Sequence, residues 1–396
     1  MRLLLRARKQ RAYLGHLGER FGFYDIEPGE NTLWLHAVSV GETRAAAPLV
    51  DKLIETYPEC RILITHMTPT GRETGKKLYG EKATVCYLPY DYPFAVRRFL
   101  KHFRPRAGLL METELWFNLI HHCRTSAVPL FLVNARLSQK SLEGYLKIKR
   151  LSGNALKELE GIAAQTAEDA ARLEKLGAQG VSVCGNLKFD VFPPENIQDF
   201  RPYFEGRRSF LAASTREGEE ALILDAFENL EGFLLVIVPR HPQRFSEVEN
   251  LLKSRKISYV KRSENRKIAP DTKVFLGDSM GELHAYYAAC DCAYIGGSLL
   301  PYGGQNLIEA ASLGKPVLFG PHTYNFEEAC NLALEGGAAV RVENASELAV
   351  EVAKLLENPE KMGKMGEAGM AFAEKNRGAV RKIMSLVSPA LEIRGL

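Results

Sequence analysis

The chain has 396 residues, which is enough for two domains that each bury a core of their own. Apolar residues make up 46% and charged residues 25%, an ordinary balance for a globular protein in water. The net charge of +4 is too small to indicate a nucleic-acid partner, and no arginine-aromatic pattern of an RNA-binding protein occurs. The cysteines are scattered along the chain, so we expect all seven to be buried thiols in a reducing compartment, with no zinc site.

The first eleven residues combine three leucines with five basic side chains, which are Arg2, Arg6, Arg8, Lys9 and Arg11. This stretch is too short and too charged to span a bilayer, and no later run reaches roughly 18 apolar residues. It also lacks the apolar core of a signal peptide. A basic start that contains leucines favours contact with an anionic membrane surface, and a solvated leader helix would fit the same residues.

From Thr32 onward, short apolar segments alternate with helical patterns, which is typical of a parallel sheet covered on both faces. The expected strands of the first half are Thr32–Ala37, Arg61–Met67, Thr84–Leu88, Ala107–Met111, Leu130–Asn134, Gly161–Gln165 and Val181–Cys184. Those of the second half are Ser209–Ala213, Leu234–Val238, Val274–Leu276, Ala293–Ile295, Val317–Phe319 and Ala338–Val342.

The alternation stops at Val191–Arg208, which contains three prolines and shows little periodicity. We therefore predict an α/β chain of two Rossmann-like domains, an acceptor-binding domain at 1–190 and a nucleotide-binding domain at 209–396 that ends in a helical segment. A linker at 191–208 joins them, and the two domains should face a central cleft. Ligands of such sheets bind at the carboxyl ends of the strands, so the candidate residues are sought there.

The stretch Gly296–Pro321 has glycine pairs after an expected strand and a helical pattern at Gln305–Leu313. Glycines at a strand end let a ligand approach the backbone closely. The helix N-terminus at Gln305 and Asn306 would attract a phosphate, and Glu309 could bind a pair of ribose hydroxyls. An ordinary β-loop-α unit contains the same elements, so it is their order that favours nucleotide binding.

Charged residues follow three strands of the first half. Glu42 comes after Gly41 at an expected helix start, where the helix dipole should keep its carboxylate ionised, although a routine first-turn acid would look the same. Of the two acids after the fourth strand, Glu114 is assigned to the start of the next helix and Glu112 to function, because ionised carboxylates beside a buried strand need partners. Lys188 could meet an anionic donor or be a plain linker lysine.

Candidates for anion binding follow three strands of the second half. Ser214 ends one strand, and the amides beyond it would suit an anionic group. Arg240 lies between two prolines after the next strand, which favours a fixed partner for phosphate or carboxylate. Asp278–Glu282 follows a third strand, with an expected helix start at Ser279. Each signal is weak alone, and together they indicate an anionic ligand.

Seven segments occur in the order typical of one family: HAVSVGE, METELW, NARLS, GNLKFD, VPRHPQRF, GDSMGEL and GGSLLPYGGQNLIEA. With them the chain resembles the 3-deoxy-D-manno-octulosonic acid (Kdo) transferases of lipopolysaccharide assembly, from about Tyr24 onward. The resemblance implies a GT-B enzyme that moves Kdo from CMP-Kdo onto the lipid A precursor. It also implies that this enzyme works at the cytoplasmic face of the inner membrane.

Carried over by position, the resemblance implies that Glu42 is the general base and that Glu112 and Lys188 assist the transition state. The expected CMP-Kdo site consists of Ser214, Arg240, His241, Met280, Gly281, Glu282, Asn306, Leu307, Ile308 and Glu309. The family usually has an apolar anchor segment before the basic stretch, and this sequence shows none, so the mode of anchoring stays open.

The chemistry of the donor fits these residues. CMP-Kdo carries one phosphate and one sugar carboxylate, and no Asp-x-Asp triplet for a divalent ion occurs, so we expect transfer without a metal or cofactor. A carboxylate base would deprotonate the acceptor hydroxyl as it attacks the anomeric carbon, and a single displacement would invert that centre. Two alternatives remain: a GT-B transferase that uses another nucleotide sugar, and a non-catalytic lipid-surface binding protein on a GT-B scaffold.

Overall fold

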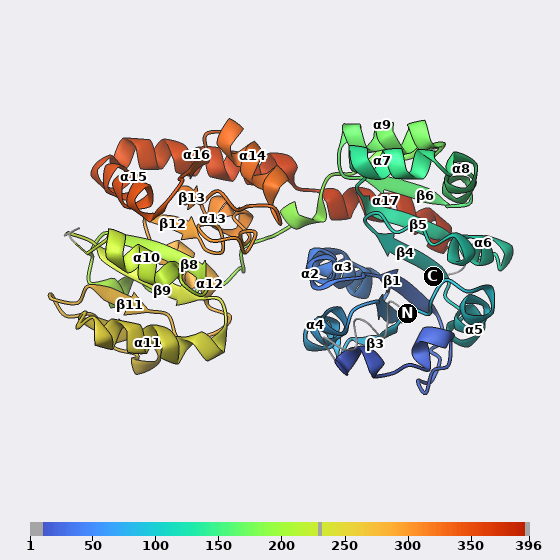
Figure 1. Ribbon diagram of the computed structural model, residues 1–396, viewed down its shortest axis with the longest axis horizontal. Helices are drawn as coiled ribbons and strands as arrows, with labels where there is room; N and C mark the ends of the chain where they lie inside the picture. Colours follow the sequence, from blue (N-terminus) through green and yellow to red (C-terminus); the bar gives the residue numbers. More distant parts are fainter. Residues whose placement is uncertain (1–10, 229–231, 393–396) are drawn as a thin grey trace. The chain divides into compact units, whose positions relative to one another are not determined.

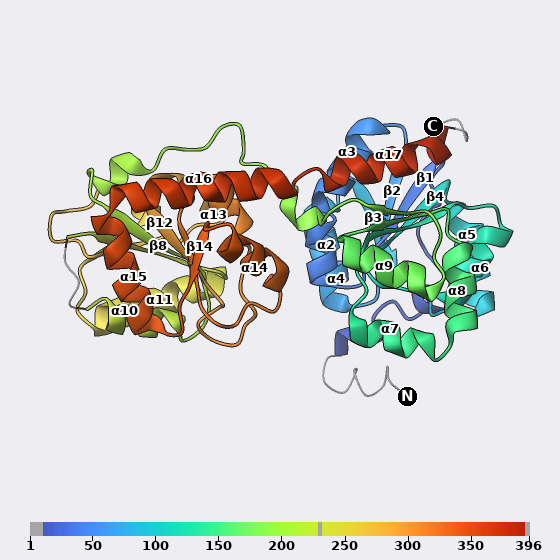
Figure 2. The same cartoon turned by 90° about the horizontal axis from the view of Figure 1, so that it is seen from above.

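A computed structural model describes residues 11–228 and 232–392 (Figure 1). The chain forms two compact units, unit 1 with Met1–Asp190 and Asn376–Leu396, and unit 2 with Val191–Lys375. Within the described residues, each unit contains one seven-stranded sheet in which all neighbouring strands are parallel. Helices cover both faces of each sheet, as the second view makes clear (Figure 2). The predicted α/β class is confirmed.

The sheet of unit 1 has the strand order β3-β2-β1-β4-β5-β6-β7. Its strands are β1 (Thr32–His36), β2 (Arg61–His66), β3 (Ala83–Tyr87), β4 (Ala107–Met111), β5 (Leu130–Ala135), β6 (Gly161–Ala164) and β7 (Val181–Val183). Its helices are α2 (Val40–Ala45), α3 (Ala47–Thr56), α4 (Pro69–Tyr79), α5 (Pro93–Phe103), α6 (Phe117–Thr125), α7 (Gln139–Leu146), α8 (Lys149–Lys157), α9 (Ala167–Leu176) and α17 (Ala379–Glu392), with short 3-10 turns η1 (Arg11–Leu14), η2 (Glu19–Phe21) and η3 (Leu187–Phe189).

Successive side chains of a strand point to opposite faces of the sheet, and in unit 1 both faces are buried. Leu33 and Leu35 of β1 belong to one core, which includes residues of α3 and α17. Trp34 lies between them in sequence and belongs to the other core, with residues of α5, α6, α8 and α9. This burial on both sides explains why the strands read as continuous apolar runs.

Unit 2 repeats the architecture with the strand order β10-β11-β9-β8-β12-β13-β14. Its strands are β8 (Ser209–Thr215), β9 (Leu234–Pro239), β10 (Tyr259–Lys261), β11 (Val274–Leu276), β12 (Cys292–Ile295), β13 (Val317–Phe319) and β14 (Ala339–Arg341). Its helices are α10 (Glu219–Ala226), α11 (Phe245–Ser254), α12 (Leu283–Ala289), α13 (Ile308–Ser312), α14 (Glu327–Glu335), α15 (Ala345–Glu357) and α16 (Pro359–Asn376), with 3-10 turns η4 (Arg201–Phe204), η5 (Pro242–Arg244) and η6 (Arg262–Glu264).

The last helix corrects the predicted domain boundary. The first break falls after Asp190 as expected, but α17 packs in the core of unit 1 rather than with unit 2. The buried Asp190 carboxylate accepts hydrogen bonds from the backbone N–H groups of Gly378 (2.6 Å) and Val380, at the start of α17. A carboxylate at this helix end satisfies amides that have no partner within the helix, so residues 376–396 belong to the first domain.

Three residues without glycine's freedom adopt left-handed backbone conformations at carboxyl ends of strands. They are Glu112 (φ 60°) after β4, Asn134 (φ 53°) in β5 and Ser214 (φ 55°) in β8. At Asn134 and Ser214 the register of strand pairing also shifts. Such conformations are unfavourable and tend to collect at functional sites, so they direct attention to these strand ends.

Two further expectations concern the cysteines and the membrane. All seven thiols are free, and six are buried, but Cys60 is partly exposed, so the expectation of seven buried thiols is wrong for that residue. No helix in the described part of the chain combines the length and the apolar character that a membrane span needs.

Candidate functional site

In unit 1, the loop between β1 and α2 holds the carboxylate of Glu42 by both of its oxygens. The backbone N–H of Val38 donates to Oε2 (2.8 Å), and the Ser39 hydroxyl donates to Oε1 (2.9 Å). Ser39 caps α2, since its Oγ accepts a hydrogen bond from the Glu42 N–H. This arrangement resembles a capping box, with the N–H of Val38 in place of that of Ser39, and it fixes the Glu42 side chain at the carboxyl end of β1.

Burial raises the pKa of Glu42 to about 7, against the lowering effect of the hydrogen bonds from Val38 and Ser39. The negative charges of Glu112 and Glu114 raise it further. The expectation that the helix start keeps this carboxylate ionised is therefore wrong near neutral pH, because loss of water outweighs the dipole. A pKa near neutrality suits a group that must accept a proton and release it again.

Glu112 and Glu114 lie in the turn after β4. The Glu112 N–H donates to Val133 O of the neighbouring strand (3.0 Å), which ties this turn to β5. Helix α6 begins only at Phe117. The prediction that Glu114 starts this helix is therefore wrong. Burial and the charge of Glu112 raise the pKa of Glu114, which places both acids in the electrostatic surroundings of Glu42.

Lys188 is held at the same edge of the sheet by amide side chains that the sequence reading did not single out. Asn134 Oδ1 accepts a hydrogen bond from Leu187 N (3.0 Å), and Asn186 Oδ1 accepts one from Lys188 N (3.0 Å). Gln165 links the two asparagines, because its side chain donates to the backbone carbonyl of Asn134 (2.9 Å) and accepts from Asn186 Nδ2 (3.1 Å). The turn η3, which carries the half-buried Lys188, is thereby fastened to the ends of β5 and β6.

Two neutral histidines lie at the ends of β1 and β2 near the Glu42 loop. Burial lowers the pKa of His36 to about 3 and that of His66 to about 4. His66 Nδ1 donates to Ala37 O (2.7 Å), and His36 Nδ1 lies 2.9 Å from the Thr65 hydroxyl. These uncharged rings support the loop without adding charge to the site, and only their place at strand ends could have revealed them.

In unit 2, the ends of β8 and β12 approach each other so closely that only glycine fits at position 296. A Cβ on Gly296 would lie 2.4 Å from Ser214 O. Ser214 is itself buried, with the left-handed backbone described above. Ser214 is therefore part of a tightly built strand end, and its hydroxyl has little exposed surface.

Arg240 and Glu309 act on the same buried phenol. Burial raises the pKa of Tyr287, the charge of Glu309 raises it further, and the charge of Arg240 lowers it. Asn306 joins this group, because its Nδ2 donates to Glu309 Oε1 (3.2 Å). Arg240 and Glu309 thus both act electrostatically on Tyr287, and Asn306 contacts Glu309; all three were predicted to belong to one nucleotide site.

The glycine-rich loop enters its helix later than expected. Helix α13 begins at Ile308 and has five residues, and the side chain of Asn306 accepts a hydrogen bond from Ile308 N (3.0 Å). The predicted phosphate site at a helix start on Gln305 is therefore wrong in its geometry. Leu307 and Ile308 are also buried in the core, so a ligand could meet only their backbone.

The segment Met280–Glu282 is held by an ion pair between its last residue and Arg262. Arg262 Nη2 donates to Glu282 Oε1 (2.9 Å), and the Ser279 hydroxyl donates to Oε2. Met280 is largely exposed. Gly281 has a backbone φ of 84°, which residues with a side chain rarely adopt. His241 lies one residue past Arg240, immediately before η5, so it belongs to the same strand-end turn.

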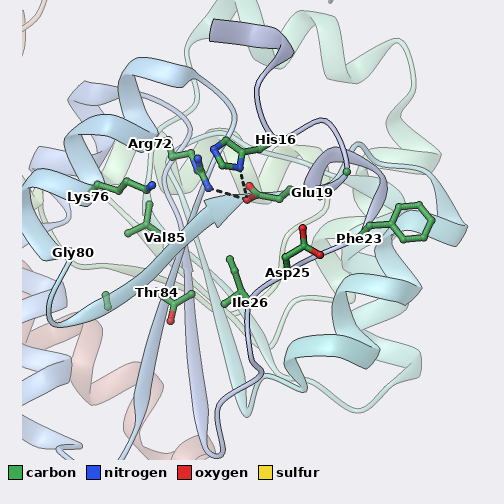
Figure 3. A pocket seen from close by; sticks show the side chains of 12 residues that line it. His16, Glu19, Phe23, Asp25, Ile26, Arg72, Lys76, Gly80, Thr84 and Val85 are labelled. Atoms are coloured by element: carbon green, nitrogen blue, oxygen red, sulfur yellow. Dashed lines mark hydrogen bonds and ion pairs between the residues drawn. The ribbon is translucent and has the colours of Figure 1, made fainter.

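A hollow of unit 1 is lined by none of these residues. This pocket has a volume of about 650 Å³ beside the edge strand β3, and Arg72, His16 and Glu19 are among the residues that line it (Figure 3). Glu19 accepts hydrogen bonds from Arg72 Nη2 and from Tyr87 N, both at 2.8 Å, and His16 lies 3.3 Å away. Because the buried charge is already compensated within the protein, nothing here points to a ligand. Elsewhere in the described residues, no group of three or more His, Cys, Asp or Glu is arranged to hold a metal ion.

Residues 15–191 match the family described as 3-deoxy-D-manno-octulosonic-acid transferase (kdotransferase), and residues 221–372 match the group 1 glycosyl transferases. The chain is 42% identical over 368 residues to the 3-deoxy-D-manno-octulosonic acid transferase of Bordetella pertussis. The matched region covers 89% of this chain and 86% of that protein. The transferase of the same name from Haemophilus influenzae is 38% identical over 400 residues, with coverage of 97% and 93%.

Comparison with solved structures shows the fold of the chain. The UDP-GlcNAc 2-epimerase of Neisseria meningitidis, bound to UDP-GlcNAc, is 18% identical with a TM-score of 0.57, covering 91% of this chain and 100% of that one. A spinosyn rhamnosyltransferase in complex with spinosyn aglycone is 14% identical with a TM-score of 0.56, covering 90% and 99%. At such identities the likeness concerns the fold alone, and the predicted GT-B fold is confirmed.

Proposed function

Because the chain belongs to the family of 3-deoxy-D-manno-octulosonic acid (Kdo) transferases, we propose that it transfers Kdo from CMP-Kdo to the lipid A precursor of lipopolysaccharide. The main support for a transfer reaction is the state of Glu42. Its carboxylate is held by both oxygens at a strand end and has a pKa of about 7. Such a group is suited to remove a proton from a hydroxyl that attacks an activated sugar.

In the proposed reaction, the acceptor hydroxyl gives its proton to Glu42 while its oxygen attacks the anomeric carbon of Kdo. The bond from that carbon to the phosphate oxygen breaks at the same time, and CMP leaves with the electron pair. A single displacement of this kind inverts the anomeric centre. Lys188 and Glu112 would assist at the transition state, with Lys188 offsetting negative charge on the sugar carboxylate or the departing phosphate.

The donor is assigned to unit 2, where Arg240 and Glu309 both act on the Tyr287 phenol and Asn306 contacts Glu309. Arg240 would pair with an anionic group of CMP-Kdo, and Glu309 with hydroxyl groups. His241, Ser214 and Met280–Glu282 extend the proposed site along neighbouring strand ends, and the backbone at Leu307 and Ile308 completes it. Since CMP leaves as a stable anion, the proposal includes neither a metal nor a cofactor.

Mass spectrometry tests this proposal. Incubation with CMP-Kdo and the tetraacylated lipid A precursor should give a product heavier by the mass of Kdo, and no product should form from UDP-sugars. In calorimetric titration, CMP should bind more tightly than UDP. Binding of UDP as tight as that of CMP would favour a transferase with another donor, and CMP binding without turnover would favour a non-catalytic scaffold protein.

We also propose that unit 1 binds the anionic cytoplasmic face of the inner membrane, where a lipid acceptor would be found. The basic residues Arg2, Arg6, Arg8 and Lys9 lie outside the described residues, as does the side chain of Arg11. Support comes from an exposed aromatic surface formed by η2 and α5, to which Phe21, Phe23, Tyr92 and Phe94 contribute.

Basic charge accompanies this aromatic surface. The Arg98 guanidinium lies 4.2 Å from the ring centre of Phe23 and 5.4 Å from that of Phe94. Helix α5 also carries Arg97 and Lys101 and has no acidic residue. Aromatic rings beside basic side chains favour the interface of a bilayer that contains anionic lipids.

Replacing both Phe23 and Phe94 by serine is expected to reduce binding to vesicles of phosphatidylcholine and phosphatidylglycerol by roughly tenfold, because about 2 kcal/mol of apolar burial per ring is lost in part. Cosedimentation measures the effect. The matched control replaces Val350 and Met370, which are comparably exposed in unit 2, and should bind as the wild type does. If all three proteins bind the vesicles equally, the aromatic surface does not contact the membrane.

A further inference from the structure

Two adjacent acids in the first turn of α10 are buried, although neither belongs to the proposed donor site. Glu219 has 0% and Glu220 has 1% of its surface exposed. Buried carboxylates are costly unless hydrogen bonds or cations compensate their charge. The contacts of these two side chains therefore show what the fold uses them for.

Glu219 accepts four hydrogen bonds, two at each oxygen. Oε1 accepts from the Tyr294 hydroxyl (2.6 Å) and Leu299 N (3.1 Å). Oε2 accepts from Gly297 N (2.6 Å) and Arg216 N (2.8 Å). Three of the four donors are backbone amides, and three belong to the segment that ends β12 and opens the glycine-rich loop.

The contact continues along that loop. Gly297 donates its N–H to Glu219, and its carbonyl accepts a hydrogen bond from Gly304 N (2.7 Å). Gly303 and Gly304 have φ of 90° and 74°, so few other residues could follow this path. Two residues later comes Asn306, which contacts Glu309. Two hydrogen bonds thus link Glu219 to Gly304, which lies two residues before Asn306.

Glu220 holds a different part of the same unit. Its Oε1 accepts hydrogen bonds from the Thr215 hydroxyl (2.6 Å) and from Arg244 Nη1 (2.8 Å). Arg244 closes the turn that begins at β9, since its N–H donates to His241 O (3.0 Å). Arg240 N donates to Thr215 O (3.0 Å) in that turn. Glu220 therefore fastens the segment that carries Arg240 and His241.

We propose that Glu219 and Glu220 are positioning residues that set the two halves of the donor site relative to each other. Glu219 fixes the loop with Asn306 and Glu309, and Glu220 fixes the turn with Arg240. Because they are neighbours in one helical turn, a single rigid element determines both positions. This inference rests on the proposed donor site. A purely structural role would stabilise unit 2 without any selective effect on the donor.

Hydrogen exchange and steady-state kinetics on Glu219→Gln test the proposal. The variant keeps the size of the side chain, but it turns one acceptor into a donor that faces other donors. Amides at 297–304 should exchange faster while the rest of unit 2 is unchanged. The KM for CMP-Kdo should rise by roughly tenfold or more, with a smaller change in kcat, because misplacement of binding groups weakens ground-state contacts.

Two matched variants localise the effect. Glu220→Gln should speed exchange at 239–244 and leave 297–304 as in the wild type. Tyr294→Phe removes one donor but keeps the Glu219 carboxylate, so the KM should rise by a smaller factor, about two- to threefold. If Glu219→Gln fails to fold, a rise of the KM in Tyr294→Phe that accompanies faster exchange of Leu299 supports the proposal, and its absence counts against it.

The inference is overturned if folded Glu219→Gln has the wild-type KM and CMP affinity, or if exchange accelerates evenly across unit 2. Failure of the donor assignment is a separate result, because it appears as wild-type protein that binds no CMP. In that case the exchange maps still decide whether Glu219 and Glu220 hold the two segments.

Discussion

Exchange of Glu42 for glutamine is expected to slow Kdo transfer by at least ~10²-fold, the lower range of general-base catalysis. Glutamine can still accept the hydrogen bond from Val38 and contact Ser39, so the loop should keep its shape. CMP binding should persist, because the proposed donor residues belong to unit 2. Steady-state rates and CMP titrations on the variant measure both effects.

The control is Glu168→Gln, which changes an exposed acid in the first turn of α9 and should have wild-type rates. The wild-type kcat/KM should fall as the pH drops below about 7, because Glu42 must be ionised to accept a proton. Near-normal turnover in Glu42→Gln would place the base elsewhere, with Glu112 as the next candidate.

The raised pKa also has a consequence for stability. The ordinary value is 4.5 and the folded value about 7, so between these pH values the folded state holds the proton more tightly than the unfolded chain. Stability supplied by this proton is present below the lower value and is lost as the pH rises through about 7. Glu42→Gln should therefore gain stability relative to the wild type at pH 8.

Replacing Ile383 by alanine is expected to destabilise unit 1 by about 2–5 kcal/mol, the usual cost of truncating a large buried aliphatic side chain. Ile383 lies in α17 with 0% of its surface exposed, in the core that contains Leu33 and Leu35. Urea unfolding followed by tryptophan fluorescence measures the effect, because Trp34 and Trp116, the two tryptophans of the chain, both belong to unit 1.

Val350→Ala provides the control, because this exposed residue of α15 lies in unit 2 and should change stability by less than about 0.5 kcal/mol. An unchanged fluorescence transition in Ile383→Ala would mean that α17 contributes little to the core of unit 1.

The sequence predicted the fold because burial on both faces of a parallel sheet leaves a local record. Strand β1 alternates between two cores, so its Leu33–Leu35 form one apolar run. Strand β10 was missed, since only Val260 of its three residues is buried. The place of α17 could not be predicted either, because Asp190 and Gly378 are 188 residues apart in sequence.

For the site, local patterns suggest candidate residues but say nothing of their state. The order Gly41-Glu42 after a strand makes this carboxylate a candidate, but its pKa depends on burial and on Glu112, which only the folded chain brings near. Glu219 read as an ordinary acid at a helix start, because nothing in the sequence shows that it is buried beneath the glycine-rich loop.

The return of α17 to unit 1 has a consequence for how the chain is made. A ribosome adds residues at roughly 5–20 per second, so many seconds separate the emergence of β7 from that of α17. During that interval, while the chain of unit 2 is being made, the face of unit 1 that α17 covers has no partner. The half of the enzyme translated first is thus finished last, and its apolar face must be kept from misassociation until then.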